Sequence, residues 1–192
     1  MVKASAPGKC ILFGEHAVVY GQPALACSIS QRMTIELKEE KTFDTWRLDG
    51  RTFNPKKHPH IDYLRKQLPP IEEHPIHIRI RGSIPKASGL GSSAALSVAL
   101  CGALQQLRGA DLNPMQASEL SHRAEANAQG GRASPMDTAT SSFGGFVVLS
   151  DTIEGDLEYL GVRTMDVEGT TLQWHLHTFN AEIPEGIALV IG

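Results

Sequence analysis

The sequence has few cysteines, and their arrangement suggests neither a disulfide framework nor a metal site. The three in the chain, Cys10, Cys27 and Cys101, lie far apart without a C-x-x-C spacing, and each has small apolar neighbours. Disulfide-stapled secreted domains carry an even number of cysteines instead. We therefore expect reduced thiols in the core of a cytoplasmic protein.

Long hydrophobic runs and an excess of positive charge are also missing. No apolar stretch approaches the ~20 residues that cross a bilayer, and the N-terminal MVKASAPGK lacks the apolar segment of a secretory signal. The formal net charge of -3 gives no basic surface of the kind that nucleic-acid-binding proteins use. Small-molecule partners are therefore favoured over nucleic acid or membrane.

The elements that are present alternate between strands and helices. The residues at 76, 78 and 80 are all isoleucine and share one face of a predicted strand, and the Ala- and Leu-rich segment 92–107 is typical of a buried helix. A second helix is predicted to begin after a cap at Asn113 and to end near Gln129. Further strands are predicted over 11–29, broken at its glycines, and over 32–40, 144–150, 172–179 and 187–191. This pattern predicts an α/β (α+β) fold with helices packed on a mixed or mostly antiparallel sheet.

The middle of the chain has no clear pattern. Residues 42–70 are polar and irregular, and the basic stretch 56–66 is best interpreted as a solvated helix or loop. At the other end, the apolar segment Ile187–Ile191 has no polar residues after it that would end a strand at the surface. We expect a further domain to follow these residues in the parent protein.

The segment Pro85–Ala95, PKASGLGSSAA, has the composition of a phosphate-binding loop. Gly89 and Gly91 allow left-handed backbone and a close approach to a ligand. The helix that follows offers free N–H groups and the positive end of its dipole to an anion. The hydroxyls of Ser92 and Ser93 can bind phosphate oxygen or Mg²⁺.

Two other interpretations fit the same loop. It can be a glycine-rich turn with a serine cap at the start of the helix. It also satisfies the dinucleotide pattern G-x-G-x-x-[GA], with Asp111 about 20 residues further on. However, SIPKAS separates Gly89 from the preceding strand, whereas the dinucleotide loop follows its strand directly, and the Walker pattern GxxxxGK[ST] is absent.

Two further groups of polar residues stand out. Lys9, Glu15 and His16 are concentrated around glycines where a strand is expected to bury apolar side chains. Asp137 precedes a short Thr/Ser/Ala-rich stretch of one or two helical turns, and Glu125 lies on the second predicted helix. The simpler alternatives are a surface lysine with a polar turn, a helix cap at Asp137, and a solvated helix face at Glu125.

Taken together, these three segments resemble the GHMP small-molecule kinases, and within them the mevalonate kinases. The matching motifs are APGKCILFGEHAVVYG, then IPKASGLGSSAALSVAL, then ASPMDTATSSFGG, in the order that the family has them. The last has the S-P-x-D form typical of archaeal-type sequences. The motifs extend from Ala6 to Gly145.

The resemblance implies a ribosomal-protein-S5-domain-2-like N-terminal domain over residues 1–192. In the family a C-terminal ferredoxin-like domain closes the cleft, and no segment of these residues corresponds to it. The implied activity is ATP-dependent phosphorylation of mevalonate to 5-phosphomevalonate, with Mg²⁺ as cofactor, in a cytoplasmic enzyme that can form a homodimer. The alternatives are mevalonate 3-kinase, phosphomevalonate kinase, diphosphomevalonate decarboxylase and, outside enzymes, a nucleotide-binding sensor.

The resemblance also implies roles for individual residues. Asp137 matches the catalytic aspartate and Lys9 the lysine beside it, whereas Glu15 and His16 match substrate-contacting positions. Ser93 and Glu125 match the metal-linked positions, although the family's glutamate lies one residue nearer the aspartate and the extra glycine of Gly130–Gly131 would absorb this offset. The residues that match the ATP phosphate loop are Pro85, Lys86, Ala87, Ser88, Gly89, Leu90, Gly91, Ser92, Ser93, Ala94 and Ala95.

Overall fold

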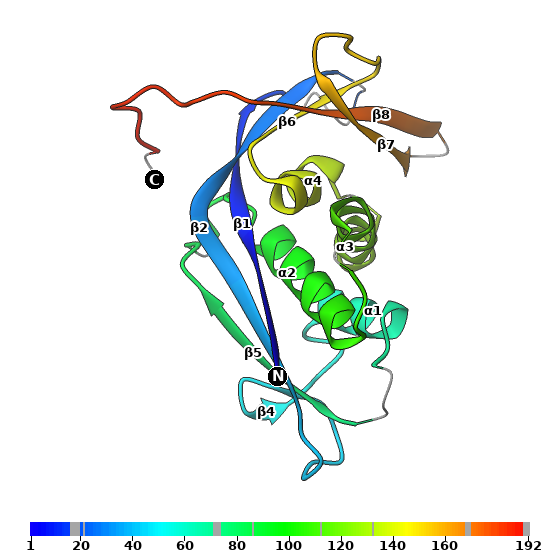
Figure 1. The fold of residues 1–192 in the computed structure, drawn as a ribbon. Helices are drawn as coiled ribbons and strands as arrows, with labels where there is room; N and C mark the ends of the chain where they lie inside the picture. Colours follow the sequence, from blue (N-terminus) through cyan, green and yellow to red (C-terminus); the bar gives the residue numbers. More distant parts are fainter. Residues whose placement is uncertain are drawn as a thin grey trace.

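In the part of the chain that the structure describes, four helices pack on one face of a mixed β-sheet (Figure 1). The computed structural model describes residues 1–15, 20, 22–70, 74–85, 87–111, 113–131, 133–167 and 170–189. The strands are β1 (Val2–Phe13), β2 (Ala24–Glu39), β3 (Arg47–Leu48), β4 (Arg51–Thr52), β5 (Ile76–Gly82), β6 (Phe146–Ser150), β7 (Glu158–Val167) and β8 (Thr170–Phe179). The helices are α1 (Pro59–Gln67), α2 (Ser92–Leu107), α3 (Pro114–Ala128) and α4 (Pro135–Phe143).

The strand order in the sheet is β4-β3-β5-β2-β6-β8-β7, and β1 pairs with β2. Among the described strands the β3–β5 pair is parallel and the others are antiparallel. This arrangement confirms the predicted α/β class with a mixed, mostly antiparallel sheet. It differs from a dinucleotide-binding unit, because α2 leads into α3 and not into a parallel strand, so exposed Asp111 lies between two helices.

The two long N-terminal strands form the centre of the structure. β1 pairs with β2 from Val2 to Phe13. The register shifts between Pro7 and Lys9, where β2 carries the extra residues of the irregularity. A Cβ on Gly8, opposite those residues, would lie 2.7 Å from the carbonyl oxygen of Leu90, so a glycine is needed where the loop before α2 packs on β1.

Helices α2 and α3 confirm the sequence prediction closely. Most of α2 is buried against β1, β2 and α3, as its Ala- and Leu-rich sequence requires. α3 begins as predicted, because the Asn113 side chain accepts hydrogen bonds from the backbone N–H groups of Met115 and Gln116. The serine-cap alternative for α2 is wrong, since its cap residue is Gly91 in the left-handed conformation with no side-chain cap.

The structure corrects several other expectations. The basic stretch forms α1, and this helix is amphipathic because Ile61 and Leu64 are buried in the core. The short β3–β4 hairpin and strand β7 were not predicted. Residues 187–189 form no regular strand, and 190–192 lie outside the described residues.

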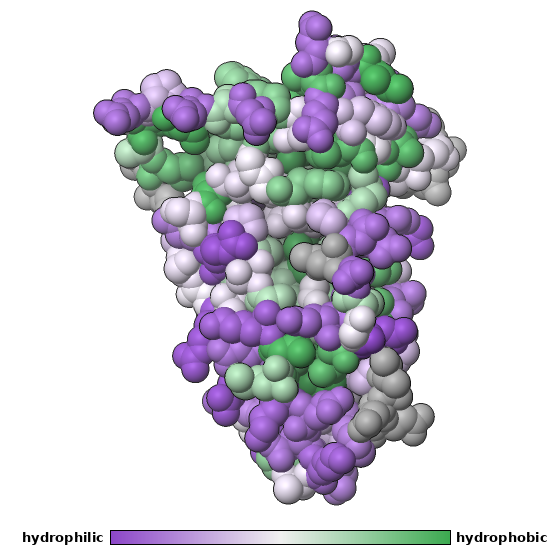
Figure 2. Space-filling model, in the orientation of Figure 1, coloured by the Kyte–Doolittle hydropathy of each residue, from purple (hydrophilic) through white to green (hydrophobic). Residues whose placement is uncertain are grey.

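The C-terminal part of the chain packs beside the sheet. Residues 182–189 run along β1, β2 and β6 and enclose a groove of about 740 Å³. Figure 2 shows apolar residues gathered at the upper left, where this segment lies, beside strongly hydrophilic ones.

The three cysteines are free thiols, and burial raises the pKa of Cys101 to about 12. Among the described helices none is both long and apolar enough to cross a membrane.

Candidate active site

Lys9 is a buried lysine that forms an ion pair with Asp137. Lys9 follows Gly8 in β1 and lies between the loop before α2 and the start of α4, where the residue is only 4% exposed. Its Nζ lies 3.2 Å from Oδ1 of Asp137. A buried ammonium group requires such a partner. The structure therefore brings together two residues that stand 128 positions apart in the sequence.

Asp137 lies in the first turn of α4, at the positive end of the helix dipole. It is not the cap that the simplest interpretation gave, because Ser134 caps the helix by accepting a hydrogen bond from the N–H of Met136. Burial raises the pKa of the Asp137 carboxyl above its ordinary value, and the charge and hydrogen bond of Lys9 oppose that rise. A carboxylate held beside a cation in partly buried surroundings is suited to accepting a proton.

The glycine loop lies directly against Lys9. The backbone N–H of Lys9 donates to the carbonyl oxygen of Leu90 at 3.0 Å. A Cβ on Gly91 would come within 2.7 Å of Cγ of Lys9, so only glycine leaves room for the lysine side chain there. The loop and the Lys9–Asp137 pair thus form one site.

The loop has the backbone conformation that the glycines predicted. Gly89 and Gly91 have φ values of 71° and 70°, and Ala87 also has a positive φ of 57°. Ser88 Oγ donates to the carbonyl oxygen of Pro85 and closes the turn. No described atom lies within 4 Å of a Cβ built on Gly89, so the backbone there faces open space in front of the α2 N-terminus. Lys86 lies outside the described residues.

Glu125 points from α3 into the N-terminal turns of α2. Its Oε1 accepts hydrogen bonds from Ser93 Oγ at 2.9 Å and Ser97 Oγ at 2.7 Å, and its Oε2 accepts one from Gln129 at 3.3 Å. The residue is 5% exposed, which contradicts the alternative of a solvated helix face. A carboxylate and a serine hydroxyl are the hard oxygen donors that Mg²⁺ takes, so this pair fits the Mg²⁺ that the resemblance implies.

One residue of this cluster was missed in the sequence. His60 on α1 places its Nε2 3.1 Å from Ser93 Oγ and 3.4 Å from Glu125 Oε1. It lies in the basic stretch that was interpreted as solvated. The available signal was the position of His60 one residue before buried Ile61, at the start of an amphipathic helix.

The predicted substrate-contacting residues are only partly described. Glu15 is exposed in the turn after β1, and its negative charge contributes to the raised pKa of Asp137. His16 lies outside the described residues. Glu125 acts on Asp137 in the same direction as Glu15, so three carboxylates share the neighbourhood of one buried lysine.

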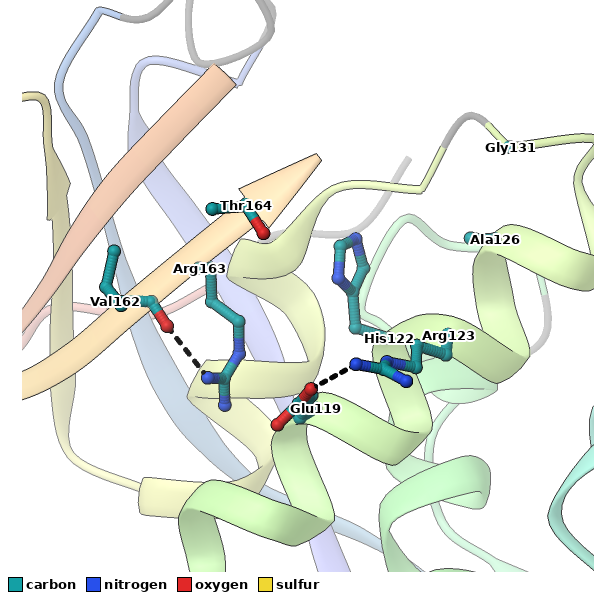
Figure 3. Close-up of a pocket in the computed structure, with 8 residues that line it drawn as sticks. All are labelled: Glu119, His122, Arg123, Ala126, Gly131, Val162, Arg163 and Thr164. Carbon is teal, nitrogen blue, oxygen red and sulfur yellow. Dashed lines mark hydrogen bonds and ion pairs between the residues drawn. The ribbon is translucent and has the colours of Figure 1, made fainter. Parts of the chain in front are cut away.

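A separate pocket of about 460 Å³ lies between α3 and β7 (Figure 3). Its ionisable side chains bond to main-chain carbonyl oxygens or, at Glu119 and Arg123, to each other. His122 Nε2 bonds to the carbonyl oxygen of Ala133 at 2.8 Å, and Arg163 donates to the carbonyl oxygens of Val162 and Met115. None of the residues named as sequence candidates lines this pocket.

Comparison with known families decides which kind of domain this site belongs to. Residues 58–145 match the N-terminal domain model of the GHMP kinases. Over these residues the chain is similar to the GHMP kinases. The match includes the glycine loop, Glu125 and Asp137, whereas Lys9 lies before it.

The curated relatives are similar to most of this chain. A mevalonate kinase of Methanothermobacter thermautotrophicus is 41% identical over 88% of the chain and 58% of the relative. One of Thermococcus sibiricus is 36% identical over 86% of the chain and 56% of the relative. The chain thus spans a little more than half the length of these relatives.

Solved structures support the same relationship. The Methanococcus jannaschii mevalonate kinase superposes with a TM-score of 0.67 at 27% identity, over 83% of this chain and 60% of the other. The Streptococcus pneumoniae phosphomevalonate kinase gives a TM-score of 0.64 at 22% identity, over 78% and 48% of the two chains. The latter likeness shows the fold alone.

Proposed function

We propose that the protein containing this chain phosphorylates mevalonate at its C5 hydroxyl with ATP. The observation that carries the proposal is the ion pair of buried Lys9 with half-buried Asp137, 3.2 Å between Nζ and Oδ1, packed against the glycine loop through Gly91. The mevalonate kinases among the relatives support this choice of substrate. No described feature favours one of the alternative GHMP activities.

The glycine loop is proposed to bind the phosphates of ATP. Its left-handed glycines and the N-terminal turn of α2 offer backbone N–H groups and a positive dipole to the β- and γ-phosphates. Ser93 and Glu125 would hold Mg²⁺. When bound, this cation neutralises phosphate charge that would otherwise repel the incoming alcohol.

Asp137 is proposed to act on the alcohol. Its carboxylate accepts the proton of the C5 hydroxyl as the hydroxyl oxygen attacks the γ-phosphorus. The bond from that phosphorus to the β-bridging oxygen breaks, and ADP leaves. Lys9 keeps Asp137 ionised and places positive charge beside the developing alkoxide.

Substrate contacts and domain organisation extend the proposal. Glu15, in the turn after β1, and His16, the next residue in the sequence, are proposed to bind mevalonate. A ferredoxin-like second domain that completes the cleft stays a prediction, as does a homodimer.

An assay of ADP release tests the function. The full-length protein would be given ATP, Mg²⁺ and, in turn, mevalonate, phosphomevalonate, homoserine or galactose. We expect turnover with mevalonate at a kcat/KM at least about 100-fold above the others, because one site-specific polar contact gives discrimination of this order or more. Turnover confined to another acceptor would reject the proposed substrate.

A further inference from the structure

Three side chains from three helices meet at the start of α2. Ser93 Oγ of α2, Glu125 Oε1 of α3 and His60 Nε2 of α1 form a triangle with edges of 2.9, 3.1 and 3.4 Å. Two of these are the proposed Mg²⁺ ligands, and the third is a nitrogen donor that the function described above does not use.

The size of this triangle fits one face of a metal octahedron. Adjacent ligands at bond lengths of about 2.1 Å lie roughly 3 Å apart in octahedral geometry. The three edges lie close to that spacing, so a cation on one side of the triangle could reach all three atoms with small side-chain movements. Three coordination positions would then remain for phosphate oxygens and water.

The negative charge of Glu125 is also not paired with a lysine or arginine among the described residues, although its side chain is only 6% exposed. Ser97 and Gln129 donate hydrogen bonds to the Glu125 carboxylate. Such hydrogen bonds orient a carboxylate that binds a metal. His60 is 25% exposed and closes the outer side of the cluster.

We propose that His60 Nε2 is a third protein ligand of the divalent cation at Ser93 and Glu125. An imidazole nitrogen suits Mn²⁺, Co²⁺ and Zn²⁺ better than Mg²⁺, which prefers oxygen. His60 therefore shifts the metal preference of this site toward first-row transition ions. The inference rests on the proposed function only in that a divalent cation accompanies the nucleotide at Ser93 and Glu125.

The cluster is an incomplete metal site without nucleotide. Within the described segments no group of three or more His, Cys, Asp or Glu side chains could hold a metal by itself, and here the third donor is a serine hydroxyl. We therefore expect the site to bind Mn²⁺ tightly only together with ADP, whose phosphate oxygens supply further ligands.

Electron spin echo spectroscopy of bound Mn²⁺ tests the ligand directly. The full-length protein, labelled with ¹⁵N-histidine, would be mixed with Mn²⁺ and unlabelled ADP, and Mn²⁺ affinity would be measured by titration. We expect a ¹⁵N imidazole coupling in the unaltered protein and its loss in His60→Ala. We also expect that variant to bind Mn²⁺ about tenfold or more weakly, with a smaller loss for Mg²⁺.

The matched control is His58→Ala. His58 lies two residues away, at the start of the same helix, and stacks on Phe53 at a ring-centroid distance of 6.2 Å. This variant should keep the ¹⁵N coupling, and thermal unfolding of both variants reports whether α1 remains folded.

The possible results distinguish the proposal that His60 binds the metal from the proposal that the protein phosphorylates mevalonate. Absence of the coupling in the unaltered protein, or its persistence in His60→Ala, overturns the proposal. If the unaltered protein shows no histidine coupling but Glu125→Gln loses Mn²⁺ binding, His60 is rejected as a ligand and Glu125 keeps its proposed role. A histidine coupling in a protein that does not phosphorylate mevalonate supports His60 as ligand and rejects the proposed substrate.

Discussion

Polar side chains of helix α3 lie in two regions, one against α2 and one facing β7. The two regions differ in the groups to which these side chains bond. On one side, Glu125 bonds to the side chains of Ser93 and Ser97 on α2. On the other side, facing β7, His122 bonds to a main-chain carbonyl oxygen, as does Arg163 across the pocket (Figure 3). The two regions lie only one helical turn apart.

This difference distinguishes residues that we expect to act in the reaction from residues that we expect to stabilise the fold. Side chains that bond to main-chain groups satisfy the backbone and fix the positions of segments. In the loop-side region Lys9, whose side chain is 5% exposed, pairs with Asp137, whose side chain is 30% exposed, and desolvation of the lysine is unfavourable. The charged pair that faces β7, Glu119 and Arg123, lies at the surface instead. We therefore expect substitutions near the loop to lower turnover and substitutions facing β7 to lower stability.

The largest effect is expected for Asp137→Asn. The amide cannot accept the alcohol proton, so kcat should fall by about 10²- to 10⁴-fold, the usual contribution of a general base. ADP release and ATP affinity would be measured on the same preparation. Unchanged ATP affinity is expected because the loop that binds phosphate is intact, and a kcat within about threefold of the unaltered protein would contradict the assignment.

Lys9→Met should give the next largest loss. Without the ammonium group, the effect of burial loses the charge and hydrogen bond that oppose it, so the pKa of Asp137 rises further above its ordinary value. Because Asp137 acts in its ionised form, the acidic limb of the kcat profile should move to higher pH and kcat at neutral pH should fall about tenfold or more. Lys3→Met, at an exposed position on the same strand, serves as the control. An unmoved pH profile would mean that Lys9 does not govern Asp137.

Gly91→Ala tests the contact between the loop and Lys9. The new Cβ would lie 2.7 Å from Lys9 Cγ, so we expect kcat to fall about tenfold through displacement of the lysine, a typical result of small misplacements. Gly109→Ala is the matched control, because its φ of 66° is similar and no described atom lies within 4 Å of the added methyl. Both variants should lose about 1–2 kcal/mol of stability from left-handed backbone. Equal turnover in the two would refute the role of the contact.

His122→Leu should lower stability more than turnover. The carbonyl oxygen of Ala133 loses its partner, which lowers the free energy of unfolding by about 1–3 kcal/mol, and kcat at low temperature should change less than about threefold. Urea unfolding monitored by circular dichroism measures the first quantity. A loss of turnover as large as that of Asp137→Asn would remove the distinction between the two regions.

The same variant carries a pH signature. Burial lowers the pKa of His122 in the folded state, so the unfolded chain binds the proton more readily. The stability that His122 contributes is then present at high pH and declines as pH falls below about 6.5, the ordinary histidine value. The free energy of unfolding of His122→Leu should therefore depend less on pH in this interval.

The local features of the site were predictable from sequence because they depend on residue type. Asn113 caps α3, and Gly89 and Gly91 adopt left-handed backbone, for reasons contained in a few neighbouring residues. The family motifs also pointed to Lys9 and Asp137, although only the fold brings their side chains together.

What the sequence did not reveal depends on long-range packing. His60 meets Glu125 only because α1 packs beside α2 and α3, and no short-range pattern encodes that contact. Strand β7 was missed because it alternates weakly and is specified by its pairing with β8. A strand was predicted for the segment at 187–189, yet apolar composition without pairing leaves it irregular.

The position of the transferred phosphoryl group tests the central claim most directly. The full-length protein would be incubated with ATP and ¹³C-labelled mevalonate, and the product examined by ³¹P and ¹³C NMR. The account predicts phosphorus coupling at C5 with the unaltered protein and no product above background with Asp137→Asn. Coupling at the C3 position, or equal product from the two proteins, would contradict it.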